Sequence, residues 1–210
     1  MALRVDTLML QRTPEWFAAR LGKVGASRMD AIMADPGGKK GLVGRRNYCR
    51  ELAMERRYGT VQENSYLSNA MAKGIELEAE ARRSFEFDQN VVVTECGFIE
   101  HPRIPMAGAS PDGLIGDDAV LELKCPEANN MYEALIHAPL DKKYLYQAQW
   151  QLACTGRARA YVAFYREGVP HVAVTTLLRD NALIAKMEAE VQEFLADVAH
   201  DTQQLWKERP

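Results

Sequence analysis

The stretch that most constrains this chain is residues 110–126, SPDGLIGDDAVLELKCP. The Gly-Asp-Asp at 116–118 is a turn signal, because Gly adopts positive φ without steric cost and Asp hydrogen-bonds its own backbone. Apolar residues lie on both sides of this turn, so the sequence predicts a tight hairpin. Pro111 cannot donate to a sheet ladder, and we expect the strand before Asp112 to end there.

Side chains along the second strand of this hairpin alternate between two faces. Glu122 and Lys124 therefore share one face, and the bend lets Asp112 approach it. Two nearby carboxylates repel each other and need a cation between them; Mg²⁺ suits such a site because it takes hard oxygen ligands and keeps exchangeable waters. The backbone carbonyl of Leu123 is a plausible extra ligand, and Lys124 could orient water and stabilise charge on a phosphate. The alternative is a hairpin with one wet face, on which these side chains are only solvated.

Pro-Asp, a short hairpin and then Glu-Leu-Lys form the signature of the PD-(D/E)xK nuclease superfamily. The longer string SPDGL…LELKCP resembles the lambda exonuclease and YqaJ-type viral recombinase family. The resemblance implies an α/β fold whose central mixed sheet of about five strands is flanked by helices, in a single nuclease domain over residues 1–210. It also implies digestion of linear duplex DNA from 5′ ends, which releases 5′-mononucleotides and leaves 3′ single strands for recombination by annealing.

The resemblance further assigns roles to the central residues. Asp112, Glu122 and the Leu123 carbonyl would hold a pair of Mg²⁺ ions, which Mn²⁺ can replace, while Lys124 would activate water. The family also implies a ring-shaped homotrimer around DNA ends. A single-strand annealing protein of the same phage would be its partner, in the cytoplasm of a bacterial host.

Three further segments resemble this family. GIELEAEARRSFEF is similar to the helix with the first acidic motif and places Glu78 where it would hold water or Lys124. YLYQAQWQLACTG is similar to a Q-x-Q helix beside the metal site, and makes Gln147 the candidate for holding Lys124 or the attacking water. RLGKVGASR is similar to a segment that contacts DNA phosphates through Arg20 and Ser27. Without the resemblance, the acid and the glutamine would be ordinary helix-surface residues, Ser27 a helix N-cap and Arg20 a solvated charge.

Charge is unevenly distributed along the chain. The formal net charge of −3 argues against an indiscriminate polyanion binder. Basic residues outnumber acidic ones between positions 36 and 60, and acidic residues dominate positions 180–210. A basic zone on an acidic body suits a protein that holds DNA at one place. The predicted DNA contacts in this zone are Lys39 and Lys40 in a flexible loop, and Arg46 and Arg50 on a helix over 44–58. A solvated surface helix would show the same basic face.

The 210 residues suit one domain with a substantial core. No apolar run approaches the roughly 20 residues of a membrane span, and the N-terminus lacks a signal-peptide pattern. The sequence thus predicts a cytoplasmic protein without membrane contact, and its four Cys show no zinc spacing. Strands are expected at 91–100, 104–110, 119–125, 159–165 and 171–177, and helices at 15–21, 26–34, 44–58, 67–87, 142–155 and after Asp180. Residues 129–137 are expected to form a helix or an irregular segment.

Two other functions stay open at this stage. One is an endonuclease of the superfamily or a RecB-like nuclease domain, which digestion of closed circular DNA would distinguish. The other is a non-catalytic module that binds DNA ends. The joint presence of Glu78, Asp112, Glu122 and Lys124 speaks against that module, because a protein without chemistry has no need of Lys124 beside the acids.

Overall fold

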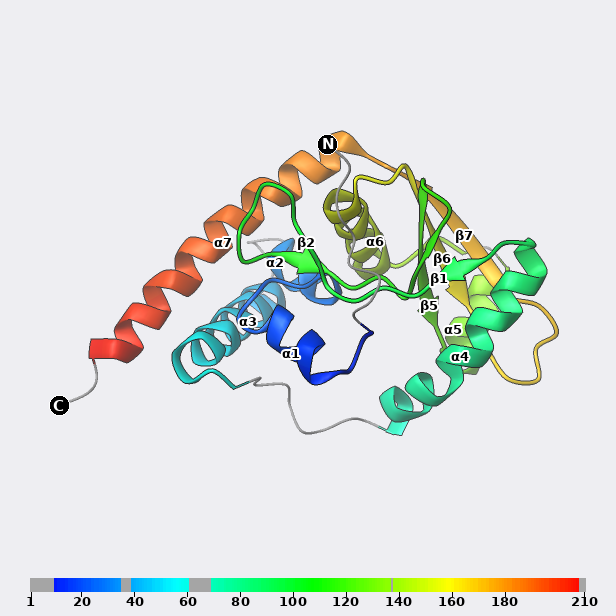
Figure 1. The fold of residues 1–210 in the computed structure, drawn as a ribbon, viewed down its shortest axis with the longest axis horizontal. Helices are drawn as coiled ribbons and strands as arrows, with labels where there is room; N and C mark the ends of the chain where they lie inside the picture. The colour runs from blue at the N-terminus through cyan, green and yellow to red at the C-terminus, as the bar shows by residue number, and fades with distance from the viewer. Residues whose placement is uncertain (1–9, 35–38, 61–68, 137, 208–210) are drawn as a thin grey trace.

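The computed structural model describes residues 10–34, 39–60, 69–136 and 138–207 (Figure 1). Its helical elements are α1 (Pro14–Arg20), the short 3-10 turn η1 (Ala26–Arg28), α2 (Met29–Ile32), α3 (Lys39–Tyr58), α4 (Asn69–Gln89), α5 (Ala128–Leu135), α6 (Lys142–Thr155) and α7 (Asn181–Lys207). Its strands are β1 (Val93–Thr94), β2 (Ile99–Glu100), β3 (Gly108–Ala109), β4 (Gly113–Ile115), β5 (Ala119–Lys124), β6 (Arg159–Phe164) and β7 (Ala173–Leu178).

The main sheet has five strands in the order β1-β4-β5-β6-β7. The β5–β6 pair is parallel and the other pairs are antiparallel, so the sheet is mixed. β4 and β5 form the predicted hairpin, with Gly113 opposite Leu121 and Ile115 opposite Ala119. Gly116 in its turn has φ +49°, a conformation that Gly adopts readily. The predicted α/β fold with a mixed five-stranded sheet is confirmed.

Two predicted strands are assembled differently. Residues 91–100 hold two short strands, of which β1 joins the main sheet while β2 pairs with β3 in a separate two-stranded sheet. The segment 104–110 is therefore not a strand of the main sheet, and β4 takes that place. Gly108 permits the tight β2–β3 contact, since a Cβ there would lie 2.6 Å from the carbonyl oxygen of Ile99.

Lys39 and Lys40 also differ from expectation, because their backbone belongs to the first turn of α3 and not to a loop.

Helices cover both faces of the sheet at β5 (Figure 1). Leu121 and Leu123 pack against Ala81 and Phe85 of α4. Val120, on the opposite face, belongs to the cluster that α6 helps to form. The predicted alternation along β5 is thus observed, and the even-numbered side chains point toward α6.

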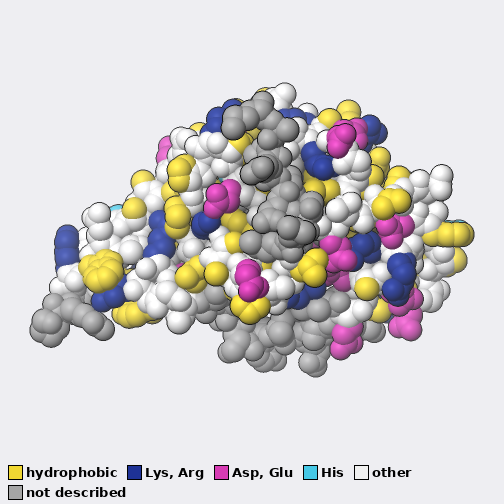
Figure 2. Space-filling model, in the orientation of Figure 1, with side chains coloured by type: hydrophobic (Ala, Val, Ile, Leu, Met, Phe, Trp, Pro, Cys, Tyr) yellow, Lys and Arg dark blue, Asp and Glu magenta, His cyan; other side chains and the backbone are white. Residues whose placement is uncertain are grey.

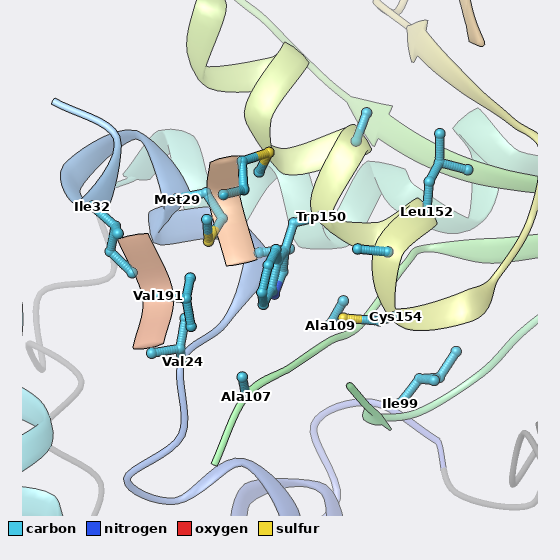
Figure 3. Close-up of a cluster of buried hydrophobic side chains, with 14 of the residues drawn as sticks. Val24, Met29, Ile32, Ile99, Ala107, Ala109, Trp150, Leu152, Cys154 and Val191 are labelled. Atoms are coloured by element: carbon cyan, nitrogen blue, oxygen red, sulfur yellow. The ribbon is translucent and has the colours of Figure 1, made fainter. Parts of the chain in front are cut away.

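The larger apolar cluster lies between α6 and the N-terminal helices (Figure 3). Trp150 of α6 is fully buried in it, and its Nε1 donates a hydrogen bond to the carbonyl oxygen of Gly108 at 3.1 Å. α7 extends from this cluster along α3 (Figure 1), where Tyr48 stacks on Phe194 with ring centroids 5.3 Å apart. Within the described ranges, no helix has the length and apolar character needed to cross a membrane.

Candidate active site

The hairpin fixes Asp112 against β5. The Asp112 N–H donates to the carbonyl oxygen of Leu121 at 3.0 Å. The Leu123 N–H donates in return to Asp112 Oδ2 at 2.7 Å. The Asp112 carboxylate is therefore held beside the backbone that separates Glu122 from Lys124.

Glu122 is the centre of a polar network between β5 and α6. Its side chain lies on the central strand, and the residue is only 3% exposed. Oε1 accepts hydrogen bonds from Lys124 Nζ and Gln147 Nε2, both at 2.6 Å. Oε2 accepts from Gln151 Nε2. The alternative of a hairpin with one solvent-exposed face is therefore wrong, because side chains of α6 cover this face and donate hydrogen bonds to the Glu122 carboxylate.

Gln147 also contacts the lysine, since Lys124 Nζ donates to Gln147 Oε1 at 3.2 Å. This contact agrees with the expectation that Gln147 holds Lys124. The catalytic purpose of the contact stays a prediction.

Burial and the close carboxylates shift the ionisation of this cluster. Burial raises the pKa of Asp112 well above its ordinary value, and the charge of Glu122 raises it further. Burial by itself lowers the pKa of Lys124, but Glu122 and Asp112 outweigh this effect, and the net pKa is raised. Lys124 therefore stays protonated at neutral pH, and one ammonium group faces two carboxyl groups.

Glu78 reaches the same site from α4. Its Oε1 accepts from Arg82 Nη2 at 3.1 Å, and its Oε2 accepts from Arg12. Arg82 also pairs with Glu95 at 2.7 Å. Among the described contacts, Glu78 thus pairs with arginines and not with Lys124. We expected Glu78 to hold either water or Lys124, and the contact with Lys124 is not observed.

Sequence reasoning missed three residues of this network: Arg12, Arg82 and Gln151. Arg82 and Gln151 each follow a predicted site residue by four positions, Glu78 and Gln147, so helical spacing could have found them. Arg12 could not have been found in this way, since 66 residues separate it from Glu78.

A short loop between α1 and η1 places Arg20 and Ser27. The Arg20 guanidinium lies over the Trp16 ring, 4.2 Å from its centroid. Gly22 has φ +65°, and its N–H donates to Glu55 Oε2 at 2.7 Å. Ser27 is exposed and lies inside η1, whose N-cap is Gly25, so the interpretation of Ser27 as a helix cap is wrong.

One cavity of about 450 Å³ joins these groups. The sequence-predicted site residues that line it are Arg20, Ser27, Glu78, Asp112, Glu122, Leu123, Lys124 and Gln147. Segments from the N-terminus, α4, the hairpin and α6 thus meet around a single space, although Arg20 and Gln147 are 127 positions apart in the sequence.

A model of the YqaJ-like viral recombinase domain family matches residues 15–158. The chain belongs to this family. An alkaline exonuclease from Laribacter hongkongensis, LHK-Exo, is 39% identical, with a TM-score of 0.83 over 93% of this chain and 97% of that one. LHK-Exo in complex with dAMP gives the same identity and coverage and a TM-score of 0.84. A phage-related exonuclease from Haemophilus somnus 129PT shares the fold at 17% identity, with a TM-score of 0.63 over 89% of this chain and 96% of that one. A search of curated protein sequences found no match.

Two other DNA contacts that we predicted for this YqaJ-like domain, Arg46 and Arg50, are not among the residues that line the cavity. Arg46 and Arg50 lie along a second cleft between α3 and α7, together with His200. The side chains of Lys39 and Lys40 fall outside the described residues.

The charge pattern of the molecule is also more mixed than the sequence suggested. Arg45 of α3 pairs with Asp197 of α7 at 3.1 Å, so the basic and acidic zones partly neutralise each other. Figure 2 shows acidic and basic side chains interspersed on the face in view, not gathered into one basic field.

Proposed function

We propose that this chain is a Mg²⁺-dependent exonuclease that digests linear duplex DNA from its 5′ ends, releases 5′-mononucleotides and leaves 3′ single strands for recombination by annealing. Nuclease activity itself is supported by the family and by 39% identity to an alkaline exonuclease over nearly the whole chain. The observation that carries the finer proposal is the single cavity that Asp112, Glu122 and Lys124 share with Arg20 and Ser27.

The residues present fit a divalent metal. Asp112 and Glu122 offer hard carboxylate oxygens on adjacent backbone, and the Leu123 carbonyl lies between Glu122 and Lys124 in sequence; oxygen donors of this kind suit Mg²⁺ or Mn²⁺. In the described part of the chain, no three His, Cys, Asp or Glu side chains are grouped to hold a metal ion. The proposed ligand set consists of the two carboxylates and the backbone carbonyl, completed by water and substrate phosphate.

The protein side of the reaction follows from the contacts. Bound Mg²⁺ would supply positive charge beside the scissile phosphate and acidify water. Lys124 Nζ would orient the attacking water and stabilise charge on the phosphate, while Gln147 fixes the direction of Nζ. Glu78, held by two arginines, would orient water from the α4 side.

Arg20 and Ser27 would bind the terminal or scissile phosphate. A guanidinium offers a planar donor fork that matches phosphate, and stacking on Trp16 restricts the orientation of this one. The adjoining turn is also fixed, because α3 holds Gly22 from both sides: Arg56 Nε donates to its carbonyl oxygen at 2.8 Å and Glu55 accepts from its N–H. Direction from the 5′ end would follow if this pocket receives the 5′-phosphate.

The wider assembly is proposed from the family resemblance. It comprises a homotrimeric ring around the DNA and a single-strand annealing protein as partner, in the cytoplasm of the bacterial host. The residues 1–210 would act as one nuclease domain in each copy.

The test is digestion of one plasmid in two forms, linear and closed circular, with Mg²⁺, with Mn²⁺ and with EDTA. We expect loss of the linear form in either metal, no loss in EDTA and an intact circle. Linear duplex labelled at the 5′ or the 3′ end should release label first from the 5′ end, as mononucleotide. Cutting of the circle would favour the endonuclease or RecB-like alternative. DNA binding without digestion in any metal would favour the non-catalytic module.

A further inference from the structure

We propose that Arg12 binds a backbone phosphate of the DNA at the rim of the site, a role that rests on the proposed function. Arg12 lines the same cavity as Asp112, Glu122 and Lys124. Its side chain is 42% exposed, and it is anchored by its ion pair with Glu78. An arginine fork carries five N–H donors, and among the described residues a single carboxylate oxygen engages it.

The backbone at Arg12 is held in a conformation that favours glycine. Its φ is +66°, and non-glycine residues in this region are found mainly where the surroundings enforce them, often at functional sites. Both neighbours supply that enforcement. Gln11 Nε2 donates to the Pro111 carbonyl oxygen at 2.7 Å, directly before Asp112. Thr13 caps α1 by accepting from the Trp16 N–H at 3.2 Å.

Neutralising Glu78 engages only one end of Arg12. Arg82 also pairs with Glu78, at 3.1 Å, and its side chain is only 13% exposed, although it is shared with the exposed Glu95 at 2.7 Å. A second and more exposed guanidinium on the same carboxylate adds little stability, because solvent screens such pairs. Its exposed donors are better explained by a ligand that enters the cavity.

Electrostatics gives the class of that ligand. Three carboxyl groups line the cavity: Glu78, Asp112 and Glu122. They would repel a phosphodiester backbone, while Lys124 is already hydrogen-bonded to Glu122 and Gln147. Arg12 places a cation beside Glu78, and Arg20 places a second one in the same cavity. Two guanidinium groups in one cavity suit a strand that carries several phosphates.

The test compares the wild type with Arg12→Gly. Glycine adopts φ near +66° without steric cost, so this variant permits the same backbone conformation and removes the whole side chain with its guanidinium. Binding of 5′-phosphorylated duplex is measured in Ca²⁺ across a series of salt concentrations, with intact DNA verified on a gel. We expect about tenfold weaker binding and a slope of log K against log salt reduced by about one, as for the loss of one phosphate contact. Calcium affinity without DNA and the melting temperature should stay at or above the wild-type values.

In the alternative, the ion pair of Arg12 only holds the N-terminal segment against α4. Arg12→Gly would then lower the melting temperature and the calcium affinity together with DNA binding, and that result overturns the proposal. An Arg12→Gly variant that binds DNA as tightly as the wild type also overturns it. Arg12→Lys should restore the salt slope, because it restores the charge; a slope as low as that of Arg12→Gly would contradict phosphate binding. Digestion of linear duplex by the wild type in Mg²⁺ is measured separately from binding. If the wild type does not digest it, the proposed function is refuted, and not the role of Arg12 in binding.

Discussion

Glu122 occupies a position where strand physics favours an apolar residue. β5 lies between β4 and β6, and helices cover both of its faces. A buried carboxylate is costly unless it is paired and hydrogen-bonded. The chain meets this cost with Lys124, Gln147 and Gln151, and a hydrophobic side chain would have served stability equally well. The retained charge is therefore best explained by chemistry at this residue.

Lys124→Ala tests that explanation at the residue scale. The substitution removes the ammonium group that would orient water and stabilise charge on the phosphate, and we expect kcat for digestion to fall by about 10²- to 10³-fold, the usual range for a lost charge-stabilising group. Single-turnover digestion of linear duplex in saturating Mg²⁺ measures this effect. Circular dichroism should show an unchanged fold.

The matched control is Lys143→Ala. Both lysines lie over the Tyr144 ring, with Nζ of Lys124 5.1 Å and Nζ of Lys143 4.6 Å from its centroid, but the carboxylate partner of Lys143 is Asp141 at the start of α6. Its removal should leave digestion within about twofold of the wild type, as expected for an exposed pair. Full activity of Lys124→Ala would remove Lys124 from the mechanism.

At the scale of elements, α6 uses its glutamines for two separate purposes. Gln147 and Gln151, four positions apart, share a helix face and bind the two oxygens of Glu122. Gln149 points elsewhere: its Nε2 donates to the Leu178 carbonyl oxygen at 2.8 Å, and its Oε1 accepts from the Asp180 N–H at 2.9 Å. Gln149 thereby ties α6 to the end of β7 and the start of α7.

This division predicts different effects on catalysis for two leucine substitutions on α6. Gln151→Leu leaves Glu122 Oε2 without its donor and should lower kcat by about tenfold or more, as for a lost orienting contact. It should also destabilise the fold by about 1–3 kcal/mol, because this carboxylate oxygen is buried. Gln149→Leu should destabilise the fold by about 1–3 kcal/mol, because two backbone groups lose their partner.

Urea unfolding and single-turnover digestion of both variants provide the comparison. Gln149→Leu should digest DNA at the wild-type rate once corrected for the folded fraction. Equal catalytic losses in the two variants would mean that α6 acts only as a support, and the assignment of Gln151 to Glu122 would then fail.

α6 also shows why some elements were predictable and others were not. Its predicted bounds, 142–155, are those observed, because local signals mark both ends: Asp141 accepts from the Lys143 N–H, and Gly156 has φ +72°. The hairpin was predictable for the same reason. The segment 91–100 was not, since partners distant in sequence decide that β1 and β2 join different sheets.

The site residues likewise fall into those that local sequence signals mark and those that only the folded chain brings together. Glu122, Lys124 and Asp112 lie within one local motif, and Gln147 and Glu78 were assigned by resemblance. Of the two arginines on Glu78, Arg82 lies four positions away on the same helix and could have been found by spacing. Arg12 could not, because it meets that carboxylate only after the chain has folded. The spacing of arginines along α3 predicted a basic face on this helix. It could not show that Arg46 and Arg50 on this face lie along α7 and not in the cavity.

On the scale of the whole molecule, the proposed ring requires surface that one copy leaves open. Large apolar side chains are exposed at separate places, including Phe87 and Val92, which are 87% and 78% exposed. Burial of such side chains between copies is favourable. The proposed homotrimer predicts a mass three times the 23.6 kDa of one chain in sedimentation equilibrium at micromolar concentration.

A ring that encloses its substrate also predicts how digestion responds to competitor DNA. Once a labelled duplex is engaged, excess unlabelled duplex added together with Mg²⁺ should leave its digestion nearly unchanged, because a closed ring cannot release DNA sideways. Pre-mixing the competitor with the labelled duplex is the control and should suppress digestion. A monomeric mass, combined with digestion that stops when the competitor is added, would show that one copy acts alone. The assembly would then have to be abandoned, while the active-site proposal, which needs residues of a single chain, would stand.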